Sequence, residues 1–336
     1  MASAIRNWGE IIRTQNLSPD KAMDPVSRWL LITRASVFPM TILSGLIGGL
    51  LAARAPAADF RLFALAVVGL VIAHAANNMI NDYFDLEGGV DSDDYVRVQY
   101  APHPVLSGLI SKKGLLLAIA IANLADLAIL YALASARGPA LVVFALLGLF
   151  VSVFYVAPPL KLKHHGLGEP GVFLVWGPLM IGGTYYATAG TVEPGVLVAS
   201  VPYALLVTSV LMGKHVDKIE ADTAKGIHTL PVILGRERAL ALTRGMMVAF
   251  FALVGALVAT GALGVWTLLS FAAVPRVRKI LPVFRKPKPA APPPRYPLWP
   301  LWYVSFAFLV TRTAGGWFVI GLVLDAIYPL HLPTLL

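Results

Sequence analysis

Residues 62–85 read LFALAVVGLVIAHAANNMINDYFD, an apolar run that ends in a cluster of amides and carboxylates. The apolar part is long enough for a helix to cross a bilayer, so the sequence predicts a membrane-spanning helix here. More acid follows at Asp91, Asp93 and Asp94, and six of the 18 acidic residues fall between Asp82 and Asp94. Carboxylates near a bilayer are energetically costly and usually mark a functional site.

The whole chain has the composition of a helical membrane protein. Of its 336 residues, 57% are hydrophobic and 13% are charged, and the mean hydropathy is +0.74. Long uncharged runs recur throughout, which indicates a polytopic helical bundle rather than a soluble domain. Because the chain has no cysteine, disulfides, thiolate metal sites and cysteine nucleophiles are excluded.

The apolar runs predict an all-α protein with nine membrane-spanning helices. The expected spans are residues 30–54, 60–84, 115–135, 139–156, 168–189, 195–213, 239–260, 262–275 and 302–328. Residues 1–28 lack the apolar run of a signal peptide, so we expect them to form a cytoplasmic segment. Part of this segment could form a helix with one apolar face. Region 29–275 then holds eight spans and both acidic motifs. Residues 276–300, basic and then proline-rich, predict an extended cytoplasmic linker before the last helix in 301–336.

The positive charges give the expected orientation. Of the 27 Lys and Arg residues, Arg54, Arg61 and Arg137 fall in loops on one side of the predicted membrane, and most others lie on the opposite side. Positive charge in short loops marks the cytoplasmic side. We therefore expect a multi-pass cell-membrane protein with its N-terminus and acidic motifs in the cytoplasm and its C-terminus outside. The net charge of +9 then reflects topology, not nucleic-acid binding.

The first acidic motif has the spacing of a metal site at the end of a helix. Asn78 and Asp82 are four residues apart, as are Asn81 and Asp85, so each pair shares a helix face. Two glycines after the helix would let Asp91 fold back toward these groups. Mg²⁺ prefers one or two carboxylates together with substrate phosphate oxygens. A solvated acidic loop is the alternative, but the asparagines add polar groups where leucine would be less costly.

A second acidic motif, Asp217, Glu220 and Asp222, follows another long apolar stretch. Mixed charges after a membrane span are common, so this motif alone would be weak evidence for a site. Beside the first motif, on the same predicted membrane face, it predicts divalent cations that together hold a polyanion.

A third polar segment, residues 155–169, is predicted on the same face. Tyr155, Lys161 and Lys163 could hydrogen-bond or neutralise a diphosphate leaving group. The alternative is that these lysines only set the topology. Within the predicted spans, Asp126 and Arg312 are costly charges that either pair with each other or line a cavity.

These three segments resemble the UbiA superfamily of intramembrane prenyltransferases. The matching residues are 81–85 through Asp91, 155–169, and Asp217 through Gly235. Within the superfamily they most resemble the branch that acts on 1,4-dihydroxy-2-naphthoate in menaquinone biosynthesis. The resemblance implies nine helices around a central cavity, with cytoplasmic cap loops and a side opening to membrane lipid. It also implies that Mg²⁺ binds a polyprenyl diphosphate, whose prenyl group is transferred to a small aromatic acceptor.

Residue chemistry and the resemblance together define an expected site. The expected metal ligands are Asn81, Asp82, Asp85, Asp91, Asp217 and Asp222. The expected catalytic groups are Asp82, Asp85, Tyr155, Lys161 and Lys218, and the expected substrate-binding groups are Arg34, Asn78, Arg97, Lys163 and Lys225. Lys218 departs from the superfamily pattern, which usually has Asp four residues before the position of Asp222. Either Asp217 replaces the usual ligand, or the Lys218 ammonium replaces part of the charge of one metal.

Two other functions remain open from the sequence. The same metal and diphosphate chemistry could serve another aromatic acceptor, a sugar phosphate, or the substrate's own double bond in terpene cyclisation. A transporter or ion channel could instead use the acids to bind a cation. That function predicts charges spread toward the middle of the membrane, whereas most acids of this chain cluster at one predicted face.

Overall fold

The computed structural model describes residues 2–92, 95–294, 296 and 298–333. Asp93 and Asp94 of the first acidic motif therefore lie outside the described residues. The described chain is built from helices, with one isolated β-bridge between His165 and His228. This confirms the expected all-α class.

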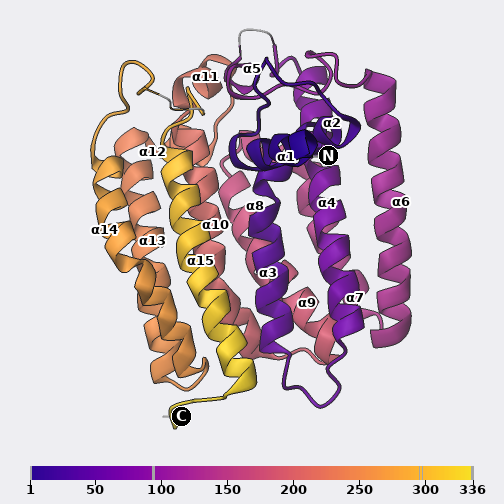
Figure 1. Cartoon of the computed structure of the whole chain (residues 1–336), viewed down its shortest axis with the longest axis vertical. Coiled ribbons are helices and arrows are strands. Elements are labelled where there is room, and N and C mark those ends of the chain that lie inside the picture. Colours follow the sequence, from indigo (N-terminus) through magenta and orange to yellow (C-terminus); the bar gives the residue numbers. More distant parts are fainter. Residues whose placement is uncertain (1, 93–94, 295, 297, 334–336) are drawn as a thin grey trace.

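Long helices run along the vertical axis of the molecule in Figure 1. They are α3 (Phe38–Leu51), preceded by α2 (Pro25–Ile32) and η1 (Ala35–Val37), then α4 (Phe60–Glu87), α6 (Lys112–Arg137), α7 (Ala140–Phe154), α10 (Pro194–Val216), α13 (Arg236–Ala259) and α15 (Tyr303–Ile327). Between α7 and α10, three helices follow one another without a break: α8 (Gly168–Leu174), the π-helical η3 (Val175–Leu179) and α9 (Met180–Ala189).

Five of these helices, α4, α6, α10, α13 and α15, are long and apolar enough to cross a membrane by themselves. A sixth span results if α2 and the segment Ala35–Leu51, which meet at 67°, are taken as one bent helix. The fold is therefore that of a polytopic helical bundle, and the number of nine spans stays a prediction.

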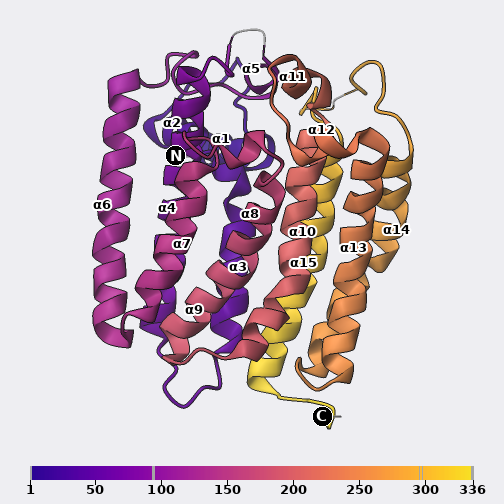
Figure 2. The same ribbon diagram turned by 180° about the vertical axis from the view of Figure 1, so that it is seen from behind.

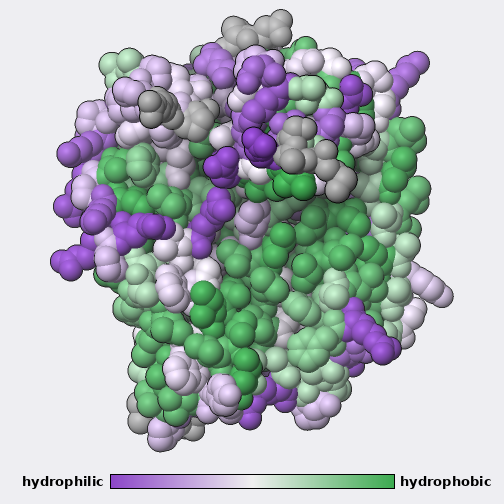
Figure 3. All heavy atoms as spheres, viewed as in Figure 1, coloured by the Kyte–Doolittle hydropathy of each residue, from purple (hydrophilic) through white to green (hydrophobic). Residues whose placement is uncertain are grey.

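The surface of the bundle is suited to lipid. On α6, Leu117, Leu124 and Tyr131 expose 62%, 65% and 76% of their surface. Figure 3 shows hydrophobic side chains over most of the lower part of one face, while hydrophilic side chains gather at its upper end. A continuous apolar surface of this kind is unfavourable in water. The chain is therefore a multi-pass membrane protein.

Both acidic motifs lie at one end of the bundle. The C-terminal end of α4, the short helix α5 (Val96–Tyr100) and α11 (Ile219–Ala224) gather at the top of Figures 1 and 2. The N-terminal helix α1 (Ala2–Thr14) lies across the bundle near this end and packs on α2 and η1. The C-terminus lies at the opposite end. Which end faces the cytoplasm stays a prediction.

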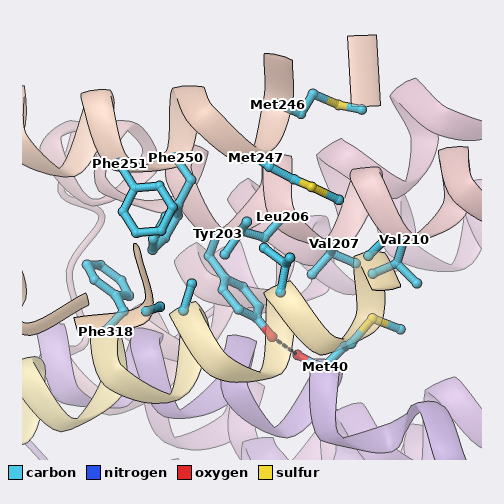
Figure 4. Packing of buried hydrophobic residues seen from close by; sticks show 14 of the residues in the cluster. Met40, Tyr203, Leu206, Val207, Val210, Met246, Met247, Phe250, Phe251 and Phe318 are labelled. Carbon is cyan, nitrogen blue, oxygen red and sulfur yellow. Dashed lines mark hydrogen bonds between the residues drawn. The ribbon is translucent and has the colours of Figure 1, made fainter. Parts of the chain in front are cut away.

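The largest cluster of buried hydrophobic residues includes side chains of α10, α13 and α15. Phe250, Phe318 and Tyr203 are fully buried there, and the Tyr203 hydroxyl donates a hydrogen bond to the Met40 carbonyl of α3 at 3.2 Å. Figure 4 shows these side chains interdigitating. Close packing of this kind resists deformation, so it holds α10 firmly, and the end of α10 carries one wall of the site described below.

The segment predicted as an extended linker begins as helix. Three elements, η4 (Val265–Ala273), α14 (Val274–Ile280) and η5 (Leu281–Arg285), carry helical structure well past the predicted boundary at residue 275. Val277, Ile280 and Phe284 are buried at spacings of three and four residues, so they form an apolar helix face. The basic residues between them occupy the other face. Basic charge and proline hide this amphipathic pattern in the sequence.

Candidate functional site

A cavity of about 750 Å³ lies inside the bundle and reaches its acidic end. Its polar end is lined by Arg34, Asn78, Asn81, Asp85, Asp91, Tyr95, Arg97, Tyr100, Tyr155, Lys163, Lys214, His215 and Lys218. Its apolar part continues between α4, α6, α7 and α9, where the lining includes Leu70, Leu130, Leu133, Leu141, Phe144 and Leu179. A largely apolar cavity with a few convergent polar groups is typical of a ligand site.

Asp85 lies in the last turn of α4, at the polar end of the cavity. Both of its carboxylate oxygens accept hydrogen bonds from Lys163 Nζ, at 2.6 and 2.7 Å. Lys163 belongs to the short helix η2 (Leu162–His164) and is itself buried. The first acidic motif and the third polar segment therefore meet in one wall.

Oxygen donors from α4 and from the loop after it fit a magnesium ion. Asn81, Asp85 and Asp91 all line the cavity. Asn81 Oδ1 is buried and has no hydrogen-bond partner among the described residues, and Asp91 Oδ2 is contacted only by His103 Nε2, at 3.4 Å. An unpartnered buried oxygen is unfavourable, and a cation would satisfy the Asn81 oxygen. Because Mg²⁺ takes oxygen ligands and keeps some of its water, these three residues fit that ion.

The sequence predicts Asp82 as a metal ligand and catalytic group, but the structure places it outside the cavity lining. Asp82 is fully buried. Arg34 donates hydrogen bonds to both of its oxygens, one of them from Nε at 3.2 Å, and Arg97 Nε lies 3.3 Å from Oδ1. The guanidinium groups of Arg34 and Arg97 both bind the Asp82 carboxylate. Asp82 thus orients the arginines that line the cavity, and its role as a metal ligand stays a prediction.

Ligand atoms of Asp82, Asp91 and His103 lie within 4.8 Å of one another, a spacing that a metal could use. The hydrogen bonds of His103 argue against that use. Its Nδ1 accepts from the backbone N–H groups of Val105 and Leu106 at 3.2 and 3.3 Å. Nε2 therefore carries the proton, and it faces Asp91 Oδ2 at 3.4 Å. A protonated nitrogen cannot bind a metal, so His103 holds the carboxylates in place.

The second acidic motif presents an ammonium to the cavity. Lys218 Nζ donates to the Tyr95 hydroxyl at 2.7 Å and to Asp222 Oδ1 at 3.0 Å, and the Tyr95 hydroxyl donates to Asp222 as well. Tyr95 follows the first acidic motif, so the two motifs meet here. Burial disfavours both charges, but their mutual attraction holds the pKa of Asp222 below its usual value and raises that of Lys218.

Asp217 caps a helix. Its oxygens accept from the backbone N–H groups of Trp302, Tyr303 and Val304 at 2.9, 3.0 and 3.0 Å. These groups open α15, where backbone donors have no partner within the helix, and the positive end of the helix favours a carboxylate. Asp217 is not part of the cavity lining. Its oxygens are engaged by backbone donors, and its role as a metal ligand stays a prediction.

This capping role predicts a stability defect. Asp217→Ala should lower the free energy of unfolding by about 1–2 kcal/mol, because three backbone donors lose their acceptor. The thermal midpoint of the purified protein in detergent measures the loss. Glu220→Gln is the matched control, since Glu220 is exposed and pairs with Arg236 at the surface. An unchanged midpoint for Asp217→Ala would contradict the capping role.

The other predicted residues divide between the cavity and the surface. Tyr155 and Asn78 line the cavity, and Asn78 Nδ2 donates to the Thr33 carbonyl at 2.9 Å. Lys161 and Lys225 are not in the lining. Lys225 is exposed and reaches the Gly89 carbonyl at 3.3 Å, so it links α11 to the loop after α4. Neither lysine is placed to bind a ligand in the cavity.

Two residues that line the cavity, Lys214 and His74, escape the sequence analysis. Lys214 lies one helical turn before Lys218, and that four-residue spacing was the available signal. Deeper in the cavity, His74 Nδ1 lies 2.7 Å from Thr41 Oγ1, which also accepts from Trp176 Nε1 at 3.1 Å. No spacing rule joins these three residues, because they come from three different helices.

Asp126 and Arg312 both line the cavity. Among the ion pairs of the described residues none joins them, and Asp126 Oδ1 is buried without a hydrogen-bond partner there. The Arg312 guanidinium lies 6.0 Å from the centre of the Phe308 ring. Of the two roles that the sequence allows, the structure shows the cavity role.

A helical membrane bundle with a charged end and an apolar chamber is the architecture of an enzyme for substrates with a polar head and a hydrocarbon tail. The profile of the UbiA prenyltransferase family matches residues 41–301. The chain belongs to this family and is a prenyltransferase.

Among its relatives, a 1,4-dihydroxy-2-naphthoate octaprenyltransferase of Bacillus subtilis is 26% identical over 245 residues, which cover 73% of this chain and 78% of the relative. A UbiA prenyltransferase domain-containing protein 1 of Gallus gallus is 28% identical over 221 residues. That match covers 62% of each chain.

Solved structures share the fold. The apo structure of a UbiA homolog from Aeropyrum pernix K1 has a TM-score of 0.64 at 20% identity, and the match covers 86% of this chain and 98% of that one. A UbiA homolog from Archaeoglobus fulgidus, bound to GPP and Mg²⁺, has a TM-score of 0.54 at 16% identity. That match covers 88% of this chain and 99% of the other.

Proposed function

We propose that this protein uses Mg²⁺ to transfer a polyprenyl group from an allylic diphosphate to 1,4-dihydroxy-2-naphthoate in menaquinone biosynthesis. The observation that carries the proposal is the cavity, which has oxygen donors and cationic groups at one end and apolar walls beyond them. The name of the Bacillus relative supports the naphthoate acceptor. The GPP and Mg²⁺ bound by the Archaeoglobus homolog support the donor and the metal.

The polar end of the cavity suits a diphosphate leaving group. Arg34 and Arg97 line it and are held by Asp82, and Lys163 enters it from the opposite segment. When the allylic C–O bond breaks, its electron pair stays on the diphosphate oxygen, and these preorganised cations stabilise the growing charge. Mg²⁺ bound by Asn81, Asp85 and Asp91 would neutralise further charge on the diphosphate.

The middle of the cavity suits the allylic cation and its acceptor. A ring carbon of the acceptor forms the new C–C bond and then loses a proton, or carbon dioxide where that carbon carries a carboxylate. Water would trap the cation as an alcohol, so the chamber must exclude it. The aromatic rings of Tyr155 and Trp176 line this region and can face a cation. His74 lines the cavity beside Trp176, so its imidazole lies within reach of a hydroxylated ring placed there.

The apolar part of the cavity suits the isoprenoid tail. It lies between α4, α6, α7 and α9, and its lining includes Leu130, Leu133 and Phe144. The outward face of α6 is strongly exposed, as on Leu124 and Tyr131. In a bilayer this helix would contact lipid, so a long tail would extend from the chamber into the membrane.

Product mass tests the proposed reaction. The purified protein is incubated with geranylgeranyl diphosphate and Mg²⁺, with and without 1,4-dihydroxy-2-naphthoate, and a sample with a chelator serves as the control. We expect a prenylated naphthoate product only when the acceptor and the metal are both present. A hydrocarbon product without acceptor would instead indicate cyclisation, which the unusual Lys218 keeps as the second candidate function. Absence of diphosphate release under every condition would overturn the proposal.

A further inference from the structure

We infer that the protein holds its diphosphate between one divalent cation and two ammonium groups. The cation would bind at the α4 wall, which carries Asn81, Asp85 and Asp91, and the ammonium groups are those of Lys214 and Lys218 at the α10 wall. Lys218 stands where a second cation would otherwise bind. The inference rests on the proposed function, because it assumes a diphosphate ligand. It concerns only how that ligand is held.

The two walls of the polar end carry opposite kinds of groups. The α4 wall offers the oxygen donors Asn81, Asp85 and Asp91. Asn81 Oδ1 is buried without a hydrogen-bond partner among the described residues, and Asp85 is paired with the Lys163 ammonium, which lines the cavity as well. The facing wall, formed by α10 and the turn after it, offers Lys214 and Lys218. A diphosphate between the walls would meet a metal site on one side and ammonium groups on the other.

The carboxylates near the α10 wall all lie outside the cavity lining, although Glu169 Oε2 and Asp222 Oδ2 are buried without a hydrogen-bond partner among the described residues. Asp217 caps α15 through both oxygens. Glu169 bonds His215 Nδ1 at 2.7 Å, and Glu220 is exposed and pairs with Arg236. Asp222 pairs with Lys218 and is not in the cavity lining. Within the described residues, this wall therefore has no pair of carboxylates open to a second metal.

The Lys218 ammonium has a donor to spare for a ligand. An ammonium has three N–H donors, and two of those of Lys218 go to Tyr95 and Asp222. Lys218 is only 6% exposed, yet it lines the cavity. Its third N–H can therefore reach an anion inside the cavity. Asp222 and Tyr95 fix the position of the ammonium, so we assign Asp222 as a positioning residue in place of a metal ligand.

Lys214 strengthens the same wall. It lies in the last turn of α10, four residues before Lys218, and both lysines line the cavity. No hydrogen bond or ion pair engages its ammonium among the described residues. An ammonium away from bulk water is unfavourable without a partner, and a diphosphate oxygen would supply one. Both ammonium groups can therefore bind the diphosphate directly, without a metal ion between them.

Counting bound metal tests this inference without measuring turnover. Mn²⁺ replaces Mg²⁺ as an observable ion, inorganic diphosphate is the probe, and electron paramagnetic resonance measures the Mn²⁺ held per protein in detergent. We expect one Mn²⁺ that depends on diphosphate. Two bound Mn²⁺ ions per protein would overturn the inference and would leave the proposed function unaffected. No bound Mn²⁺ and no bound diphosphate would count against both.

Three variants sharpen the count. Lys218→Asp should bind a second Mn²⁺, since it places a carboxylate beside Asp222. Lys218→Met should keep one Mn²⁺ and lose roughly 10- to 100-fold in diphosphate affinity, the value of a charge-assisted hydrogen bond. Lys161→Met is the matched control outside the cavity and should match the wild type. If Lys218→Asp fails to fold, unchanged diphosphate affinity in Lys218→Met would still overturn the inference.

Discussion

Asp85→Asn is expected to lower the rate of prenyl transfer by roughly 10³-fold or more, because metal stabilisation of a leaving group contributes several kcal/mol. Asp85 is the carboxylate of the α4 wall that lies at the helix end and faces the cavity. Asparagine keeps its shape and can still accept a hydrogen bond from Lys163, so the fold should persist. Turnover at saturating Mg²⁺ measures the effect, and the Mn²⁺ count should fall from one to zero.

Glu87→Gln provides the matched control for that variant. Glu87 lies two residues further along α4, where its side chain is 42% exposed and pairs with Lys112 at the surface. The same loss of charge there should leave turnover and thermal midpoint unchanged. Full activity of Asp85→Asn under saturating Mg²⁺ would refute the proposed mechanism.

The α4 wall was predictable because its information is local. Helical spacing alone places Asn78, Asn81 and Asp85 on one face of one helix, and all three line the cavity. Asp82 shows the limit of that rule. Its partners are Arg34, which adopts a left-handed conformation with φ of 56° after α2, and Arg97 in α5. Spacing within one helix carries no information about such distant partners.

The α10 wall shows a different limit. Asp217 and Lys218 form the turn between α10 and α11, and although they are neighbours in the sequence, Asp217 caps α15 while Lys218 lines the cavity. On the side of Gly213 the backbone of Val304 comes very close, with its Cα 3.0 Å from where a Cβ would lie. That contact brings the start of α15 beside Asp217. The sequence permits either Asp217 or Lys218 at the site, and only helix packing selects Lys218.

Asp82→Asn is expected to give the opposite pattern from Asp85→Asn, although the two residues are one helical turn apart. Removing one partner of a buried charge cluster typically costs about 3–5 kcal/mol, because the remaining charges stay buried without compensation. Here those charges are the guanidinium groups of Arg34 and Arg97, which are 12% and 4% exposed at the side chain. The thermal midpoint in detergent should therefore drop sharply, and by more than that of Asp85→Asn, which leaves one buried cation, Lys163, without its carboxylate partner instead of two.

The number of bound Mn²⁺ ions then distinguishes the two possible roles of Asp82, which either positions the arginines or binds the metal. If Asp82 only orients the two arginines, the folded fraction of Asp82→Asn should still bind one Mn²⁺ with diphosphate, while its KM for the allylic diphosphate rises as Arg34 and Arg97 lose their fixed geometry. If Asp82 were itself a ligand, the bound Mn²⁺ would disappear and the thermal midpoint would change little. The two carboxylates are chemically identical, so a difference between their variants must come from what surrounds each one. For Asp82 that is a pair of buried arginines, and for Asp85 it is one lysine, Lys163, and the cavity.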